Sequence, residues 1–170
     1  MVVVHISTMP ETEDVVGERF PQIRGHALDQ RDVTLPDDAQ GMVALIVLAF
    51  ERQAQSMVDS WIGPFERHLC GAGRYTYFEV PMITGLWGRM FSRFIDDGMR
   101  AGVPEKRHHN VVTYYGNFEV YSSLLALEDR GICYAFLLDK SGFIRWRGNG
   151  YSSPEEVEEL VTMARMLHER

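Results

Sequence analysis

Residues 42–50 read MVALIVLAF, a run that contains no charged side chain. A continuous apolar run of this kind is typical of a strand that is buried on both faces of a parallel sheet. It is too short to cross a bilayer, which takes about 20 residues. The run therefore predicts a central strand of an α/β domain, and nothing in the sequence predicts stable insertion into a membrane.

A helix is expected directly after this strand. Apolar residues recur at helical spacing and predict one buried face, formed by Met57, Val58, Trp61, Ile62 and Phe65. Pro64 lies within that stripe and predicts a kink or an end of the helix, because proline lacks the backbone N–H that a helix interior uses. The strand and the helix form a first βα unit.

The alternation of strands and helices continues along the chain. Residues 75–82 predict a second strand, residues 86–95 repeat the helical stripe, and residues 111–115 predict a short strand. Asn117 is a suitable N-cap for a helix that carries Val120, Leu124, Leu125 and Leu127. Each unit is expected to add to the same sheet.

The last predicted elements depart from the alternation of strands and helices. Residues 132–138 and 143–147 flank the turn Asp139-Lys140-Ser141-Gly142 and predict an antiparallel hairpin. Ser153 and Glu156 have the spacing of a capping box, with Pro154 in the first turn, so a terminal helix should begin there. The whole order predicts an α/β fold in which helices cover both sides of a mixed sheet.

The composition limits the classes of function. The chain has 170 residues, enough for one domain; we expect residues 1–40 to form an N-terminal extension with a short hairpin and residues 41–170 to form the domain. A formal net charge of -7 disfavours nucleic acid as a partner and would suit a basic protein. The first residues lack the basic and apolar regions of a signal peptide, so a cytoplasmic location is the default expectation.

Cysteine and histidine spacing predicts no metal site. Cys70 and Cys133 form no Cys-x-x-Cys pair, so neither a zinc finger nor a two-cysteine redox site is expected. Helical rise places Cys70 on the order of 20 Å from the N-terminus of its helix, which excludes a Cys70–Cys133 disulfide. His108-His109 and His68 lack a recognised ligand spacing, and we interpret them as exposed loop residues. We expect no bound cofactor.

The order of elements over residues 41–167 resembles the thioredoxin superfamily, especially its peroxiredoxin-like branch. The resemblance implies a thioredoxin-like three-layer α/β/α sandwich with a mixed central sheet, an inserted strand–helix unit, and a terminal β-hairpin plus helix. It also implies a redox pair at the start of the helix after the central strand and a cis-proline before the hairpin. Here residues 50–58 read FERQAQSMV, and the proline position falls on or next to Cys133, so both hallmarks are absent.

Further segments are similar to the mitochondrial ATP synthase assembly factors and their microbial relatives, which also lack the dithiol. They are Trp61 with Pro64-Phe65, residues 77–81, residues 94–100, and residues 137–146, which read LLDKSGFIRW. The resemblance implies a protein partner and a role as a chaperone or assembly factor.

The candidate site lies where the fold would hold its redox pair. Cys133 is the candidate catalytic residue, because a thiolate facing the helix N-terminus would be stabilised by the helix dipole and by Arg52. The alternative is that Cys133 is a small buried strand residue. The candidate ligand- or partner-binding residues are Arg52, Gln53, Gln55, Ser56 and Tyr134.

Three functions follow from this site. The leading hypothesis is a redox-inactive thioredoxin-like protein that binds a polypeptide as a chaperone or assembly factor. The rival is a single-cysteine thiol peroxidase or thiol-dependent reductase that uses Cys133. The third is a small-anion binder at residues 52–56, for which ordinary capping of the helix is the alternative. The missing hallmarks favour a protein that is not an enzyme, and a homo-oligomer is compatible with all three.

Overall fold

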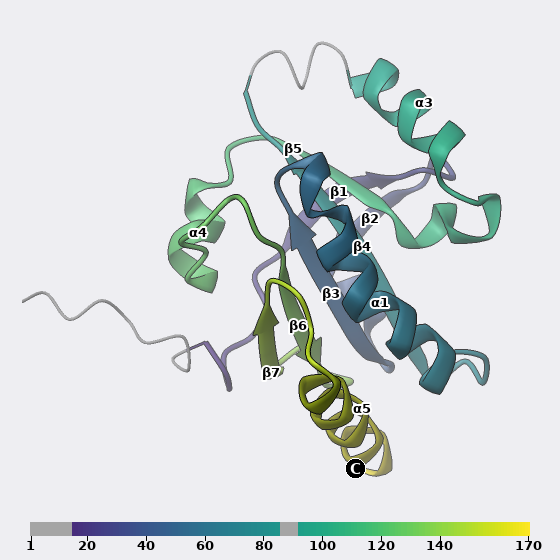
Figure 1. Cartoon of the computed structure of the whole chain (residues 1–170), viewed down its shortest axis with the longest axis vertical. Helices are drawn as coiled ribbons and strands as arrows, with labels where there is room; N and C mark the ends of the chain where they lie inside the picture. Colours follow the sequence, from purple (N-terminus) through teal and green to yellow (C-terminus); the bar gives the residue numbers. More distant parts are fainter. Residues whose placement is uncertain (1–14, 86–91) are drawn as a thin grey trace, which may run out of the picture.

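The computed structural model describes residues 15–85 and 92–170. A seven-stranded sheet in the order β2-β1-β5-β4-β3-β6-β7 forms its middle layer (Figure 1). The strands are β1 (Ile23–Ala27), β2 (Asp32–Leu35), β3 (Val43–Ala49), β4 (Tyr75–Ile83), β5 (Val112–Tyr115), β6 (Tyr134–Leu138) and β7 (Ile144–Asn149). The sheet is mixed, because β3, β4 and β5 run parallel while the remaining pairs are antiparallel.

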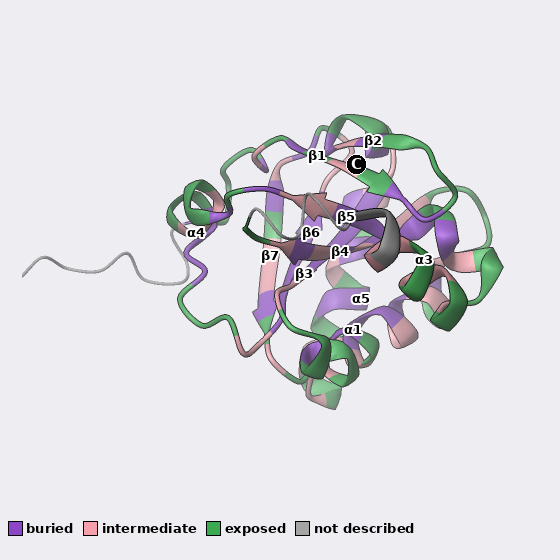
Figure 2. Cartoon of the chain, turned by 90° about the horizontal axis from the view of Figure 1, so that it is seen from above, coloured by how far each residue is buried: buried purple, intermediate pink, exposed green. Residues whose placement is uncertain are grey.

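The apolar run at residues 42–50 forms the central strand, as predicted. β3 pairs in parallel with β4 and in antiparallel with β6, and residues 43–48 are buried on both faces of the sheet. Alternate residues of β3 therefore enter two separate apolar clusters. Figure 2 shows the buried residues concentrated in these inner strands.

Helices form the outer layers. Helix α1 (Gln55–Leu69) and helix α5 (Pro154–Glu169) pack on one face, where they share an apolar cluster with Val43, Leu45 and Val47. The opposite face is covered by the segment before β1 and by helix α4 (Glu119–Leu125), which pack on Ala44 and Ile46 (Figures 1 and 2). The arrangement is the three-layer α/β/α sandwich that the order of elements predicted. Within residues 15–85 and 92–170, no helix has the length and apolar character that crossing a bilayer requires.

Helix α1 continues through Pro64 to Leu69, so of the two predicted outcomes, a kink or an end, the end at Pro64 was wrong. Proline at position 64 deprives the carbonyl group of Ser60 of its helical N–H donor. The hydroxyl of Ser152, in the loop before α5, donates to that carbonyl oxygen at 2.8 Å, and the backbone N–H of Ser152 donates to the Ser60 hydroxyl at 3.0 Å. The tertiary contact therefore replaces the missing hydrogen bond, and the helix does not end.

Helix α4 is shorter than predicted, because it ends before Leu127. Val120 and Leu124 are 60% and 56% exposed, whereas Leu125 and Leu127 are buried. The helix has only seven residues, and Ala126 ends it in the left-handed conformation at φ 51°. The chain therefore turns into the core before a longer apolar stripe can form.

The inserted helix is only partly described. Helix α3 spans Ser92–Gly102, and the predicted stripe residues 86–91 lie outside the described part of the chain. The Tyr115 hydroxyl donates to Asp96 at 2.6 Å, and the Arg100 guanidinium donates to the carbonyl oxygen of Leu28 at 2.8 Å. These contacts attach α3 to the β5 side of the sheet.

The hairpin of β1 and β2 belongs to the same sheet as the other five strands. His26 and Ala27 of β1 pair with Thr113 and Val112 of β5. The hairpin expected within residues 1–40 therefore forms one edge of the seven-stranded sheet.

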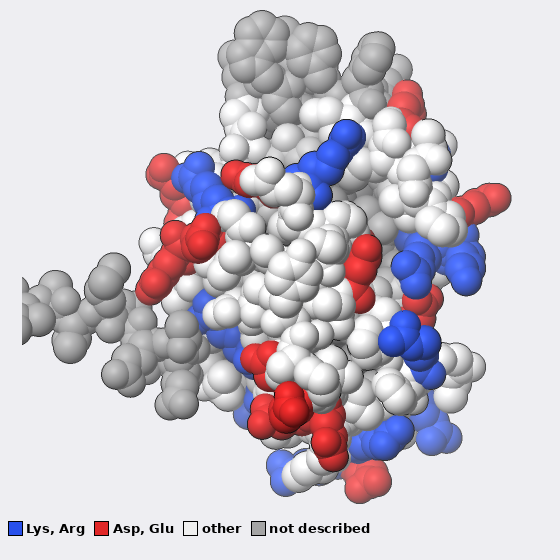
Figure 3. All heavy atoms as spheres, viewed as in Figure 1, with Lys and Arg blue, Asp and Glu red and all other residues white. Residues whose placement is uncertain are grey.

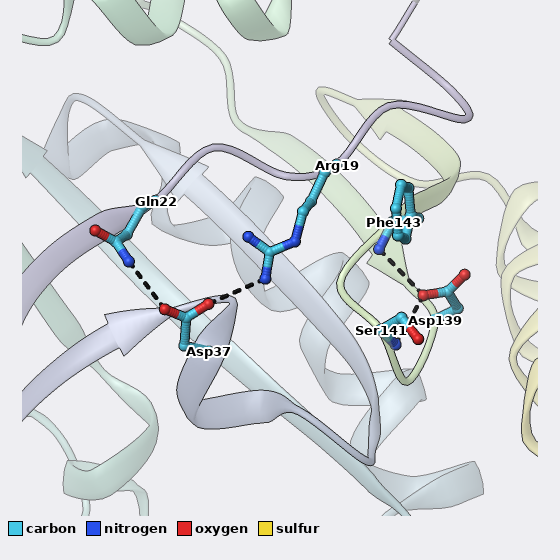
Figure 4. A network of polar contacts seen from close by, with 6 residues as sticks. All are labelled: Arg19, Gln22, Asp37, Asp139, Ser141 and Phe143. Atoms are coloured by element: carbon cyan, nitrogen blue, oxygen red, sulfur yellow. Dashed lines mark hydrogen bonds and ion pairs between the residues drawn. The ribbon is translucent and has the colours of Figure 1, made fainter.

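The carboxylates of Asp37 and Asp139 each stabilise a turn by accepting hydrogen bonds (Figure 4). Asp37 accepts hydrogen bonds from Arg19 at 3.1 Å and from Gln22 at 2.8 Å, which links the segment before β1 to the turn after β2. Asp139 accepts the backbone N–H groups of its own turn, from Ser141 at 2.9 Å and from Phe143 at 3.1 Å. The second set forms the predicted hairpin turn between β6 and β7.

The predicted capping box is present at the start of α5. The Ser153 hydroxyl accepts the backbone N–H of Glu156 at 3.2 Å, and the Glu156 carboxylate accepts the backbone N–H of Ser153 at 2.8 Å. Both donors would otherwise lack partners at the helix N-terminus.

Candidate functional site

The predicted site residues at the start of α1 do not all face the same way. The short 3₁₀ turn Arg52–Ala54 leads into the helix. The Gln53 amide donates to the Glu51 carboxylate, and the Ser56 hydroxyl lies 2.7 Å from the Tyr151 hydroxyl. Arg52 and Gln55 instead line two adjacent cavities on the other side of the turn.

Cys133 directly precedes β6 and is fully buried beneath α1. Its thiol donates a weak hydrogen bond to the carbonyl oxygen of Gly150 at 3.4 Å, and the Trp61 indole donates to the same oxygen at 2.7 Å. Burial raises the pKa of the Cys133 thiol to about 12, and the nearby Glu79 carboxylate acts in the same direction. This environment disfavours the thiolate that nucleophilic chemistry would need.

Cys70 and Cys133 are both free thiols, in agreement with the geometric expectation. Cys70 follows α1 at its C-terminal end, and burial with the Glu66 carboxylate raises its pKa to about 11.

We expect Cys133 to resist thiol reagents in the folded protein. Because its pKa rises from 9.0 to about 12, the thiolate fraction at neutral pH falls roughly 1,000-fold. In a Cys70→Ala variant, the rate of modification by a disulfide reagent should therefore be far below that of the same protein unfolded in urea. Equal rates in the folded and unfolded protein would contradict this prediction.

Tyr134 lies on the opposite face of the sheet from Cys133, because neighbouring strand residues alternate. It is buried, and its hydroxyl donates to the carbonyl oxygen of Asp129 at 2.9 Å while accepting the Asp129 backbone N–H at 2.7 Å. Its ring packs edge-on against Phe50 at 6.4 Å between centroids. Tyr134 therefore supports the loop before β6, and the structure does not bring it together with Arg52 and Gln55.

The two cavities form a groove between α1, β4 and α3, with volumes of about 450 and 530 Å³. We call the two adjoining cavities together the α1–α3 groove. The residues that line both of them are Arg52, Gln55, Glu79, Gly98, Met99, Val103 and Val111. It begins at the N-terminus of α1, which is the end of the sheet where the resemblance placed the site. Of the predicted site residues, Arg52 and Gln55 line it.

Glu79 is the functional candidate that the sequence interpretation missed. It lies on β4, half-buried, opposite Val47 of β3. Burial raises the pKa of the Glu79 carboxyl and Asp59 acts in the same direction, while a hydrogen bond from the Gln55 amide opposes both. The sequence did contain an indication of this candidate, because Glu79 is the one charged residue within the otherwise apolar stretch of residues 77–83.

Arg107 borders the far end of the groove and is already paired. Its guanidinium forms an ion pair with the Glu66 carboxylate, which also accepts the Tyr77 hydroxyl at 3.2 Å. The cation therefore neutralises Glu66 of α1, and it also acts on Glu79 across the groove, where it opposes the rise of the carboxyl pKa.

We expect Glu79→Gln to raise the free energy of unfolding at neutral pH. The folded-state pKa of Glu79 lies above the unfolded value, so ionisation of this carboxyl opposes folding, and stability is lost as pH rises from the unfolded pKa through the folded pKa. The gain from the amide should shrink as pH falls to the ordinary range of a glutamate. Urea unfolding at several pH values measures the difference, with Glu158→Gln on the exposed side of α5 as the control. A destabilised Glu79→Gln variant at neutral pH would contradict the expectation.

The histidines at positions 108 and 109 differ in their surroundings, and neither belongs to a cluster of metal-binding side chains in the described part of the chain. Among the described residues, no three His, Cys, Asp or Glu side chains converge to hold an ion. His108 is buried, with its Nε2 atom 2.8 Å from the carbonyl oxygen of Val103, so its interpretation as an exposed loop residue was wrong. The 3₁₀ helix Glu105–Asn110 turns the side chain inward, whereas His109 remains exposed.

The sheet order, the two helical layers and the position of the groove define a thioredoxin-like protein in which polar residues replace the dithiol. Residues 17–167 match the family model described as ATP10 protein. The chain belongs to this ATP10 family. No curated protein matches the chain.

Solved structures agree with the fold at low sequence identity. A proposed protein disulfide isomerase from Bacteroides thetaiotaomicron is similar with a TM-score of 0.62 and 16% identity, covering 91% of each chain. A peroxiredoxin-like protein from Aquifex aeolicus has a TM-score of 0.53 and 15% identity, covering 89% of this chain and 86% of that one. BsSco, a member of the Sco family of cytochrome c oxidase assembly proteins, has a TM-score of 0.58 and 10% identity, covering 89% and 94%. The likeness establishes the thioredoxin-like fold.

Proposed function

We propose that this protein is an assembly factor for the ATP synthase, which binds a polypeptide at the α1–α3 groove and carries out no thiol chemistry. The observation that carries the proposal is the match of residues 17–167 to the ATP10 family. The segments of this chain around Trp61 and in the β6–β7 hairpin also resemble those of the ATP synthase assembly factors. A thioredoxin-like fold also occurs in BsSco, whose family is described as assembly proteins of another respiratory complex.

The site geometry supports the absence of thiol chemistry. The N-terminus of α1, where the fold would carry its dithiol, has Arg52 and Gln55 facing the groove. Cys133 lies in the apolar cluster under α1, where burial raises its pKa to about 12. A peroxidase or reductase needs an accessible thiolate, so these surroundings favour the binding function over the single-cysteine enzyme.

The test is the assembly of the ATP synthase in the organism that produces this protein. Disruption of the gene should lower the amount of assembled enzyme on native gels, while the unassembled subunits are still synthesised. Wild-type protein and a Cys70→Ala, Cys133→Ala variant should restore assembly equally. Unchanged assembly after disruption would contradict the proposal.

Two double variants test whether the function depends on the groove or on thiol chemistry. Arg52→Ala with Gln55→Ala alters the groove, and Ser56→Ala with Gln53→Ala alters the same turn outside it. We expect only the first pair to impair assembly. If the cysteine-free variant folds but fails while both turn variants succeed, the single-cysteine enzyme becomes the better explanation.

A further inference from the structure

The charges of the α1–α3 groove are unequal. Three carboxylates line it, from Glu51 before the turn, Asp59 on α1 and Glu79 on β4. Two cations line it as well, and one of them, Arg107, is held by Glu66. The groove thus has more acidic groups than unengaged basic ones, which disfavours the small-anion ligand considered for residues 52–56.

Glu79 is the carboxylate placed deepest in the groove. It lies on the strand that forms the floor, whereas Glu51 and Asp59 are exposed at the rim. Among the described residues, no Lys, Arg or His side chain forms an ion pair with Glu79; Arg107 is paired with Glu66 and acts on the Glu79 carboxyl only from a distance. Its carboxylate has already lost part of its hydration on folding, and a cation brought to it would recover electrostatic energy with little further desolvation of the acid.

The wall beside Glu79 is apolar. Ile83 continues the floor along β4, and Ile95 and Met99 of α3 face it, with Val103 after the helix. All four are half-buried. Methionine adapts its shape to different partners, which suits a wall that accepts an aliphatic side chain. Figure 3 shows a largely uncharged surface in the middle of the face that bears α1, with acidic side chains gathered over α5.

We propose that the groove binds a polypeptide segment through a lysine or arginine that pairs with Glu79 and an adjacent aliphatic side chain that packs on Ile95 and Met99. The inference rests on the proposed function, because it names the chemistry of the partner that the assembly factor would recognise. Asp59 at the rim, which accepts the Gln55 amide at 3.2 Å, adds to the attraction for the approaching cation.

The probe is an array of overlapping synthetic peptides that covers every subunit of the source organism's ATP synthase. Full-length wild-type protein, Glu79→Gln and Glu158→Gln are applied to the array, and bound peptides are then titrated in solution by fluorescence anisotropy. Each bound peptide is also made with its basic residue replaced by glutamine. Thermal unfolding of the variants verifies that they are folded.

We expect the bound peptides to contain a lysine or arginine beside an aliphatic residue. Glu79→Gln, and the glutamine version of the peptide, should each weaken binding by at least about tenfold, whereas Glu158→Gln should bind as the wild type does. In combination the two changes should weaken binding little more than either alone, as expected for groups that pair directly.

Two results would overturn the inference while leaving the proposed function intact. In the first, the bound peptides lack basic residues; in the second, Glu79→Gln binds them within about twofold of the wild type. The proposed pairing of Glu79 with a basic residue also fails if no peptide binds. If disruption of the gene also leaves ATP synthase assembly unchanged, the proposed function fails with it.

Discussion

Replacing Trp61 with alanine is expected to lower the free energy of unfolding by about 3–5 kcal/mol. Trp61 is 0% exposed and is the largest fully buried side chain among the residues that the structure describes. Its ring packs edge-on against Trp146 at 5.3 Å between centroids, and its indole N–H donates to the carbonyl oxygen of Gly150 at 2.7 Å. Alanine would leave a cavity between α1 and the sheet and would remove the donor from that oxygen.

A loss of this size is a large share of the about 5–15 kcal/mol that stabilises a typical domain. Urea unfolding followed by far-ultraviolet circular dichroism measures it, since removing a tryptophan would complicate fluorescence. Val120→Ala on α4 is the control, because Val120 is 60% exposed and should change stability by less than about 0.5 kcal/mol. A loss below about 1 kcal/mol for Trp61→Ala would mean that the surrounding side chains collapse into the cavity.

Gly25→Ala is expected to destabilise the protein by about 1–3 kcal/mol or more through overpacking. A Cβ atom at position 25 would lie 2.6 Å from the carbonyl oxygen of Thr113 and 2.8 Å from a methyl group of Val112. Both belong to β5, which pairs with β1. The added Cβ atom can be accommodated only if β1 and β5 move apart. The edge hairpin of β1 and β2 should therefore be the first part of the sheet to become less stable.

The matched control is Gly98→Ala, at which the added Cβ has no atom within 4 Å. Gly98 lies inside α3, where alanine is favoured over glycine by about 1 kcal/mol. The two alanine substitutions should therefore change the unfolding free energy in opposite directions. Amide hydrogen exchange should also show faster exchange in β1 and β2 of Gly25→Ala, with β3 and β6 unchanged. Equal stability of Gly25→Ala and the wild type would contradict the close approach of β1 to β5.

Local sequence patterns predicted the elements that depend on neighbouring residues. The apolar run of β3 required burial on both faces, and the capping box at Ser153 supplied its own donors and acceptors, so each was visible without knowledge of the fold. The turn at Asp139 is similar, because its carboxylate bonds to backbone groups within four residues.

The errors lie where a distant segment decides the outcome. Pro64 was expected to kink or end α1, but the helix continues because Ser152, far along the chain, supplies the missing donor. The helix after Asn117 was expected to carry Leu127, yet the chain turns at Ala126 and ends the helix at Leu125. No local pattern contains either contact.

The candidate site shows the same difference between what local sequence determines and what contacts between distant segments determine. The sequence by itself determined that polar residues occupy the start of the helix after β3 and that no dithiol stands there, because both are matters of residue identity. Only the tertiary structure decided that Arg52 and Gln55 share a groove with Glu79, while Gln53, Ser56 and Tyr134 bond elsewhere. It also decided that Cys133 lies beneath α1 with a raised pKa. The physical reason is that hydration and electrostatic environment depend on which segments pack together, and that packing joins residues of α1, β4 and α3 that are distant in the chain.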